Sequence, residues 1–421
     1  ASIMAASIAL FLYIFGLWRE RDELRHRVAR MSTVGPKTDG NLTYAEFLHE
    51  SGLGRDEYSR GNLSVAYTRF TALLTRIETL PEGTPLGCGS YEHCMTLLGL
   101  ARCLKTGGQP AAAEGRLREA LAIMDVLIKQ QLDDPNFILE RGKLLGELGD
   151  VLLVRGQYLQ ARRAYEGALE VFKREGDLRS QAVMVGQLGA VQLERGEYTE
   201  ARDHYTRALG LFHALNERAM EAITWYQLGR VAEDQEEWAG AEQCYRECLA
   251  LDEQQGNIAG ASTTCNQLAM VAMSSGRSAE AEGWYKRALE LDEQIQPGSP
   301  SNTIHLNNLA DLLVTEVQAG RAPIKRLAEA RGYAERALVI KEAFDTSSGI
   351  WNTLGTLAKI ADLEGREGAA QDYRSRERET YAAFEGNRYH TYRKPGQLIA
   401  EMAAAAKGDI QAREKVDAAL P

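Results

Sequence analysis

Residues 181–212 read QAVMVGQLGAVQLERGEYTEARDHYTRALGLF, and this stretch decides the fold. Its first half carries apolar residues at helical spacing, among them Val183, Leu188 and Val191, and this spacing predicts a helix. Gly196 follows, and glycine supplies the left-handed backbone geometry that ends many helices. Residues 198–212 then carry a second apolar stripe at helical spacing. The stretch therefore predicts two helices joined by a short turn.

The same pattern recurs along the chain every 40 residues. The matching positions are Gln187-Leu188, Gln227-Leu228 and Gln267-Leu268, the alanines Ala161, Ala201, Ala241 and Ala281, and the tyrosines Tyr165, Tyr205, Tyr245 and Tyr285. A fixed period of this length is typical of a solenoid. One helix pair cannot bury both of its apolar faces, so each pair needs neighbours to stack on. We expect an all-α, right-handed superhelix of about nine helix pairs with a short C-terminal helical cap.

Irregular units extend the pattern in both directions, so we expect one elongated array. Glycine, proline and serine gather at 32–41, 81–90 and 296–301 and mark interruptions. The predicted segments are 1–40, an apolar helix and a basic helix that form a degenerate repeat; 41–136, irregular repeats; 137–296, regular 40-residue repeats; 297–385, divergent repeats with longer turns; and 386–421, capping helices.

These residues resemble a known family. The series of Leu-Gly, Tyr, Ala, Tyr and Ala resembles the tetratricopeptide repeat, lengthened from the usual 34 residues to 40. The sequence PGSP at 297–300 followed by LNNLA at 306–310 is similar to the long repeats of kinesin light chains. The tail, 397–421, resembles the segment that closes repeat arrays in bacterial multidomain signalling proteins of the STAND NTPase type. The resemblance implies an α-solenoid that binds other proteins.

Amide side chains recur at one register of the predicted first helices, directly before the Leu-Gly pair or one residue earlier. In a right-handed superhelix this register lines the concave side, and an amide offers both a donor and an acceptor to an extended peptide backbone. The resemblance to kinesin light chains implies the same use of groove asparagines. The alternative is that the amides bond to neighbouring helices or face water. The predicted peptide-binding residues are Gln187, Gln227, Arg230, Gln267, Asn266, Asn307, Asn308 and Asn352.

No chemistry beyond binding is indicated. The 49 Lys and Arg residues stand against 59 Asp and Glu residues, a net charge of −10, which argues against a nucleic-acid partner. Cys244, Cys248 and Cys265 could supply three zinc-binding thiolates, but Cys248 occupies the register of Ala208 and Ala288. We therefore expect it in the core. With no phosphate-binding, nucleophile or metal motif, we predict no catalytic residue, no metal and no cofactor, and a protein that is not an enzyme.

The N-terminal segment permits two interpretations. Residues 1–18 carry no charge and residues 19–30 contain five arginines, a pattern that suits a membrane anchor. Gly16 instead matches the turn glycine Gly196, which favours a further repeat. We expect a cytoplasmic protein, or one anchored through residues 1–18. Three functions follow: a scaffold that binds a peptide or partner protein, a sensor or oligomerisation arm of a larger bacterial signalling NTPase or protease-associated protein, or a membrane-tethered scaffold.

Overall fold

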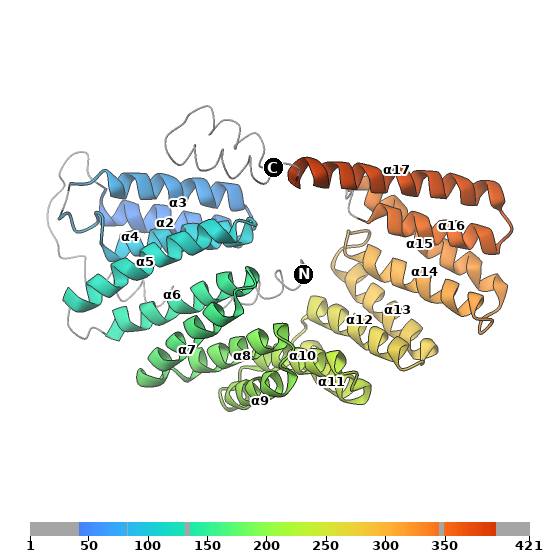
Figure 1. Ribbon diagram of the computed structural model, residues 1–421, viewed down its shortest axis with the longest axis horizontal. Coiled ribbons are helices and arrows are strands. Elements are labelled where there is room, and N and C mark those ends of the chain that lie inside the picture. Colours follow the sequence, from blue (N-terminus) through green and yellow to red (C-terminus); the bar gives the residue numbers. More distant parts are fainter. Residues whose placement is uncertain (1–41, 82, 131–134, 345–348, 393–421) are drawn as a thin grey trace. The chain divides into compact units, whose positions relative to one another are not determined.

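The computed structural model describes residues 42–81, 83–130, 135–344 and 349–392, and within them it holds sixteen α-helices and no strand (Figure 1). Consecutive helices pack in pairs, from α2–α3 to α16–α17, which makes eight pairs. The prediction of an all-α array of helix pairs is confirmed. The ninth expected pair falls in 1–40 and the capping helices fall largely in 393–421, both outside the described residues.

The chain divides into two compact units, Ala1–Met220 and Glu221–Pro421. The first unit contains α2 (Tyr44–Ser59), α3 (Leu63–Glu78), α4 (Tyr91–Thr106), α5 (Pro110–Gln130), α6 (Pro135–Val154), α7 (Tyr158–Arg174), α8 (Leu178–Glu194) and α9 (Tyr198–Ala214). Helix α10 (Arg218–Asp234) begins in the first unit and lies mostly in the second.

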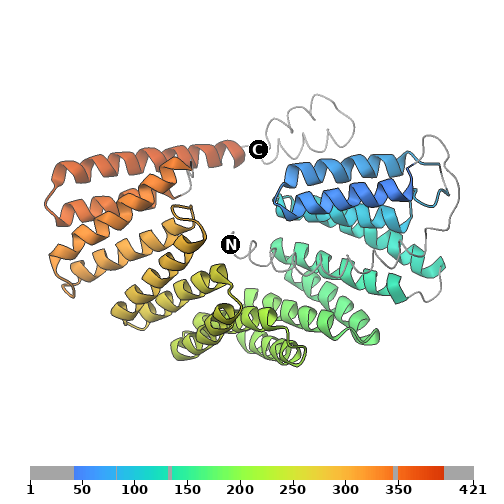
Figure 2. The same ribbon diagram turned by 180° about the vertical axis from the view of Figure 1, so that it is seen from behind.

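The second unit continues with α11 (Trp238–Gln254), α12 (Ile258–Ser274), α13 (Ser278–Ile295), α14 (Asn302–Gln318), a short 3₁₀ turn (Ile324–Arg326), α15 (Leu327–Ala343), α16 (Ile350–Leu363) and α17 (Glu367–Tyr392). Its later helices form successive stacked pairs in both views of the molecule (Figures 1 and 2).

The repeated Leu-Gly pair lets the two helices of a repeat approach closely. A Cβ atom on Gly149 would lie 2.5 Å from Cε1 of Tyr165, and one on Gly229 would lie 2.6 Å from Cε1 of Tyr245. Both distances are too short for two carbon atoms, so a side chain at Gly149 or Gly229 would clash with the tyrosine ring of the second helix. The contact spans 16 residues in each case, which explains why glycine and tyrosine recur together in the sequence.

The core of each unit is built from the positions that the repeat predicts. Ala161, Ala201, Ala241 and Ala281 have no exposed surface. Cys248, with 3% of its surface exposed, lies in the core as its register predicts, and its Sγ is 3.3 Å from the hydroxyl of Thr264. Close packing of this kind is what each helix pair obtains from its neighbours.

Among the described residues, none of the helices combines the length and apolar character that crossing a membrane requires. Residues 1–18, for which the sequence permits an anchor, lie outside the described part of the chain.

Candidate functional site

The first helices of successive repeats lie side by side within each unit, and we call their joint surface the first-helix face. In the first unit it belongs to α4, α6 and α8, and in the second to α10 from Glu221 onward, α12, α14 and α16. Hydrogen bonds that join α6 to α8, α12 to α14 and α14 to α16 define it.

A buried ionic cluster occupies this face in the first unit. Lys105 Nζ lies 2.9 Å from Glu147 Oε2 and 3.2 Å from Asp150 Oδ2, and Arg102 Nε lies 2.8 Å from Glu147 Oε1. Burial raises the pKa of Glu147, but Lys105 and Arg102 outweigh it and hold that pKa at about 2. Burial raises the pKa of Asp150 above its ordinary value, and Lys105 only partly offsets this. The positive charges of Lys105 and Arg102 therefore neutralise the two carboxylates in a site that is largely shielded from water.

The predicted site residue Gln187 belongs to the same cluster. Its Nε2 donates to Asp150 Oδ1 over 3.0 Å, and the hydroxyl of Tyr165 donates to the same oxygen over 2.8 Å. The Gln187 side chain thus joins α8 to α6, which is the alternative role that the sequence left open for these amides.

In the second unit the amides of α12 and α14 are joined in a different way. Asn308 Nδ2 donates to Asn266 Oδ1 over 3.0 Å. Asn266 Nδ2 has only long contacts, 3.4 Å to Gln267 Oε1 and 3.7 Å to the sulfur of Met270. No hydrogen bond from a described residue reaches Asn308 Oδ1. The pair of amides therefore retains one acceptor without a bond, Asn308 Oδ1, and one weakly bonded donor, Asn266 Nδ2.

The neighbouring amide positions are partly engaged as well. The hydroxyl of Thr353 donates to Asn307 Oδ1 over 3.0 Å, which joins α16 to α14. Asn352, one residue earlier on α16, is exposed. On α10, Arg230 Nη1 donates to Gln227 Oε1 over 3.2 Å. All of the predicted site residues except Gln187 therefore lie in the second unit.

Three exposed apolar side chains accompany these amides, and sequence analysis missed them. Ile223, Met270 and Ile304 expose 37%, 40% and 42% of their surface. Ile223 stands four residues before Gln227, and Ile304 four residues before Asn308. Residues at that spacing share one side of a helix, so the apolar and amide groups lie on one face. Their spacing of four residues from the repeated amides was the sequence signal that could have identified these apolar residues.

One buried cluster contains the residue types of a hydrolytic triad without its geometry. His305 Nε2 lies 3.2 Å from both Asp292 Oδ2 and Ser262 Oγ. A working triad uses the two ring nitrogens separately, one for the acid and one for the nucleophile. Ser262 is 1% exposed and also donates to the carbonyl of Ala288 over 3.0 Å. The cluster joins α12, α13 and α14 and cannot receive a substrate.

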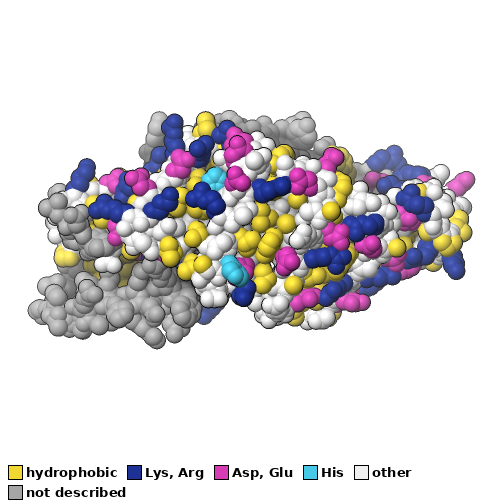
Figure 3. All heavy atoms as spheres, turned by 90° about the horizontal axis from the view of Figure 1, so that it is seen from below, with side chains coloured by type: hydrophobic (Ala, Val, Ile, Leu, Met, Phe, Trp, Pro, Cys, Tyr) yellow, Lys and Arg dark blue, Asp and Glu magenta, His cyan; other side chains and the backbone are white. Residues whose placement is uncertain are grey.

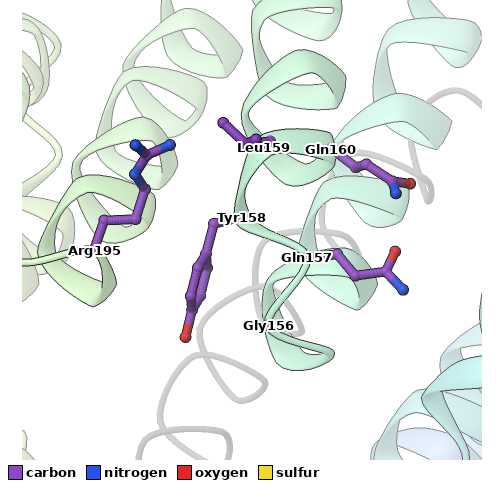
Figure 4. Close-up of a pocket in the computed structure, with 6 residues that line it drawn as sticks. All are labelled: Gly156, Gln157, Tyr158, Leu159, Gln160 and Arg195. Carbon is purple, nitrogen blue, oxygen red and sulfur yellow. The ribbon is translucent and has the colours of Figure 1, made fainter.

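The structure also has a shallow pocket of about 430 Å³ at the turn between α6 and α7. Gly156, Gln157, Tyr158, Leu159, Gln160 and Arg195 line it (Figure 4). Arg195 is paired with Glu197 at 2.6 Å. None of the predicted site residues lines this pocket. Within the described residues, no group of three His, Cys, Asp or Glu side chains could hold a metal ion.

Several charges on the second helices are paired between neighbouring repeats. Arg336 Nη2 lies 2.5 Å from Glu293, Arg376 Nη2 lies 2.7 Å from Glu342, and Arg287 pairs with Glu253. On the face drawn in Figure 3, basic and acidic side chains are interspersed. That face offers no broad basic patch of the kind that binds a phosphate backbone.

Comparison with known proteins identifies the repeats. Residues 140–212 and 180–254 match one family model described as tetratricopeptide repeat, and residues 264–297 match a second with the same description. No curated protein matches the sequence significantly.

Many solved structures are similar in fold, including the following three. The apo form of the quorum sensor NprR from B. thuringiensis is 14% identical with a TM-score of 0.56, over 90% of this chain and 100% of that one. A Rap protein complexed with Competence and Sporulation Factor is 13% identical with a TM-score of 0.53, over 91% and 98%. A Signal Transduction ATPase with Numerous Domains with a tetratricopeptide repeat sensor, from Pyrococcus horikoshii, is 13% identical with a TM-score of 0.58, over 81% and 47%.

Proposed function

We propose that this chain, which contains tetratricopeptide repeats, is a non-enzymatic scaffold that binds an extended peptide segment of a partner protein on the first-helix face of its second unit. The observation that carries the proposal is the exposure of Ile223, Met270 and Ile304 beside amides with unfilled hydrogen-bonding capacity. Apolar contacts supply affinity and a few placed polar groups supply orientation in such sites.

The atoms of the amide pair suit a peptide backbone. The bond between Asn308 Nδ2 and Asn266 Oδ1 fixes both side chains. Asn308 Oδ1 is then free to accept from a backbone N–H, and Asn266 Nδ2 to donate to a backbone carbonyl. Gln227, Arg230, Gln267, Asn307 and Asn352 would extend this recognition along α10, α12, α14 and α16. Because these contacts read backbone atoms, they tolerate different sequences.

Two proteins of similar structure support a recognition role. The Rap protein was solved complexed with Competence and Sporulation Factor, and the repeats of the Pyrococcus horikoshii protein are described as a sensor. We further propose that the protein is cytoplasmic and that its partner is a protein or peptide, with neither nucleic acid nor a cofactor involved.

Affinity capture from the native source, followed by mass spectrometry, would identify the partner, and a labelled peptide from it would give a Kd. We expect N266A/N308A to weaken that peptide about tenfold, because two hydrogen bonds of about 0.5–1 kcal/mol each are lost. Thermal unfolding should change little, since the lost bond joins two half-buried amides and its removal leaves no buried charge without a partner.

Q187A is the matched control. It removes an amide at the same register as Asn308, but one that is bonded to Asp150 in the first unit. We expect it to lower the melting temperature and leave the Kd unchanged. Equal Kd values for the wild type and N266A/N308A would refute the assigned face.

A sensor arm of a larger signalling NTPase is the second candidate function. The similarity to the Pyrococcus horikoshii protein favours it, and this chain spans 47% of that protein. The complete open reading frame of the gene tests it: an in-frame NTPase module supports the sensor arm, and its absence refutes it. Cell fractionation with and without residues 1–18 tests the membrane-tethered scaffold in the same way.

A further inference from the structure

Helices α12 and α14, which form the middle of the first-helix face of the second unit, carry few charges, so each charge there can be selective for a ligand. Helix α12, from Ile258 to Ser274, contains no charged residue. On α14, His305 is buried and Glu316 is paired with Arg321 at 2.8 Å. Asp311 is the remaining ionisable group of α14, and it is exposed.

The Asp311 carboxylate is held in place but lacks a cation. The hydroxyl of Thr356 on α16 donates to its Oδ1 over 2.6 Å, and no described Lys, Arg or His nitrogen forms an ion pair with it. Lys341 is near enough for Asp311 to raise its pKa against the lowering effect of burial, but its Nζ donates to the Gly349 carbonyl and to Thr353. Asp311 Oδ2 therefore has neither a hydrogen bond nor an ion pair with a described residue.

Asp311 lies on the same side of α14 as the side chains that we propose to contact the peptide. Ile304, Asn308 and Asp311 follow at intervals of four and three residues, so all three lie on one stripe of the helix. Seven residues of helix from Ile304 to Asp311 span about 10 Å at 1.5 Å per residue. An extended peptide covers that distance in about three residues. Along the helix, the stripe offers in this order an apolar contact at Ile304, a backbone contact at Asn308 and a negative charge at Asp311.

We propose that Asp311 selects a lysine or arginine in the bound peptide, two to four residues from an aliphatic side chain that packs on Ile304. This inference rests on the proposed function and adds the chemistry of the ligand to it. Charge complementarity carries it, because the carboxylate already has its orienting hydrogen bond and lacks only the cation. Lys359 is exposed one turn beyond Thr356 on α16. It would repel a second basic residue of the peptide, so we expect only one basic residue in the bound segment.

A displayed library of random linear peptides tests the inference on the full chain. Against the wild type we expect peptides with Lys or Arg two to four residues from Leu, Ile, Val or Met. Against D311K we expect the basic residue to be replaced by Asp or Glu at the same spacing. D311N, which can still accept the hydrogen bond from Thr356, should bind a basic wild-type peptide about three- to fivefold more weakly, and the difference should shrink in high salt.

E290K is the control for net charge. Glu290 is an exposed acid on α13, and the substitution changes the charge by the same amount away from the first-helix face. Selection of the same basic peptides by wild type and E290K, with a switch for D311K, supports the inference. Peptides without charge preference, or a D311K variant that still selects basic residues, would overturn it while leaving peptide binding intact. Failure of the folded wild type to enrich any peptide would overturn both proposals.

Discussion

Replacing Lys105 by methionine should destabilise the first unit by about 3 kcal/mol. The Lys105 side chain is 12% exposed and lies between Glu147 and Asp150, which are 14% and 8% exposed. The cluster is neutral with Lys105 and Arg102 present and carries an extra negative charge without Lys105. Removing one member of a buried ion pair costs about 3–5 kcal/mol, and the lower value applies because Arg102 still pairs with Glu147. In a unit of this size that loss lowers the melting temperature by about 6–12 °C.

The K105M variant should also show a distinctive pH dependence. Burial already raises the pKa of Asp150 in the folded state above its ordinary value of 3.8, and loss of Lys105 removes the main opposing effect. A raised pKa means that the folded state holds its proton more tightly than the unfolded state does. The associated stability is present at acidic pH and is lost as pH rises through the folded pKa. We therefore expect K105M to gain stability relative to wild type as pH falls from 8 to 5.

Urea denaturation followed by circular dichroism at several pH values measures this effect, and hydrogen exchange of α4, α6 and α8 assigns it to the first unit. The double variant K105M/D150N should recover part of the loss, because it no longer buries an unpaired acid. E147Q in the wild type, where Lys105 is present, should give no such gain in stability. A K105M variant as stable as wild type, with the same pH profile, would refute the view that the buried charges are mutually dependent.

Two further predictions concern single positions. G229A should destabilise the second unit by about 1–3 kcal/mol in denaturant titrations, because its Cβ would lie 2.6 Å from Cε1 of Tyr245. The control is G283A on α13, where no atom lies within 4 Å of the added Cβ, and it should be neutral or slightly stabilising. Equal effects of the two substitutions would contradict the packing argument. His93 accepts a hydrogen bond at Nδ1 from the N–H of Gly89 over 3.1 Å, and burial lowers its pKa below 6.5. The unfolded chain then binds the proton first, so stability should fall as pH drops below about 6.5; H93Q should flatten that part of the profile in thermal melts, and an unchanged slope would show that His93 does not cause it.

The fold could be predicted from the sequence because its decisive contacts recur at a constant spacing. Gly149 with Tyr165 and Gly229 with Tyr245 are the same contact in two repeats, so one pattern indicates all of them. The register likewise predicted that Cys248 is a core residue. Both inferences depend only on positions within one helix pair, and similar residues recur at these positions along the chain.

The bonding of the site residues could not be predicted, because it depends on what the preceding first helix presents. Gln187 and Asn308 occupy the same register, yet Gln187 meets the buried Asp150 and Asn308 meets Asn266. The ionic cluster was missed for a related reason. Arg102 and Lys105 lie in an irregular unit, and their partners on α6 are more than 40 residues away.

The two first-helix faces therefore differ in what their polar groups do. In the first unit, the carboxylates of Glu147 and Asp150 have partners within the chain, and the net gain is a fixed arrangement of α4, α6 and α8. In the second unit, Ile304 stays exposed and Asp311 lacks a cation, although an apolar contact or an ion pair would each add stability. Local departures of this kind, in an otherwise regular array, are where function is expected to override stability. A peptide that supplies an aliphatic side chain and a cation would complete both contacts at once, so the stability forgone by the free chain becomes free energy of binding.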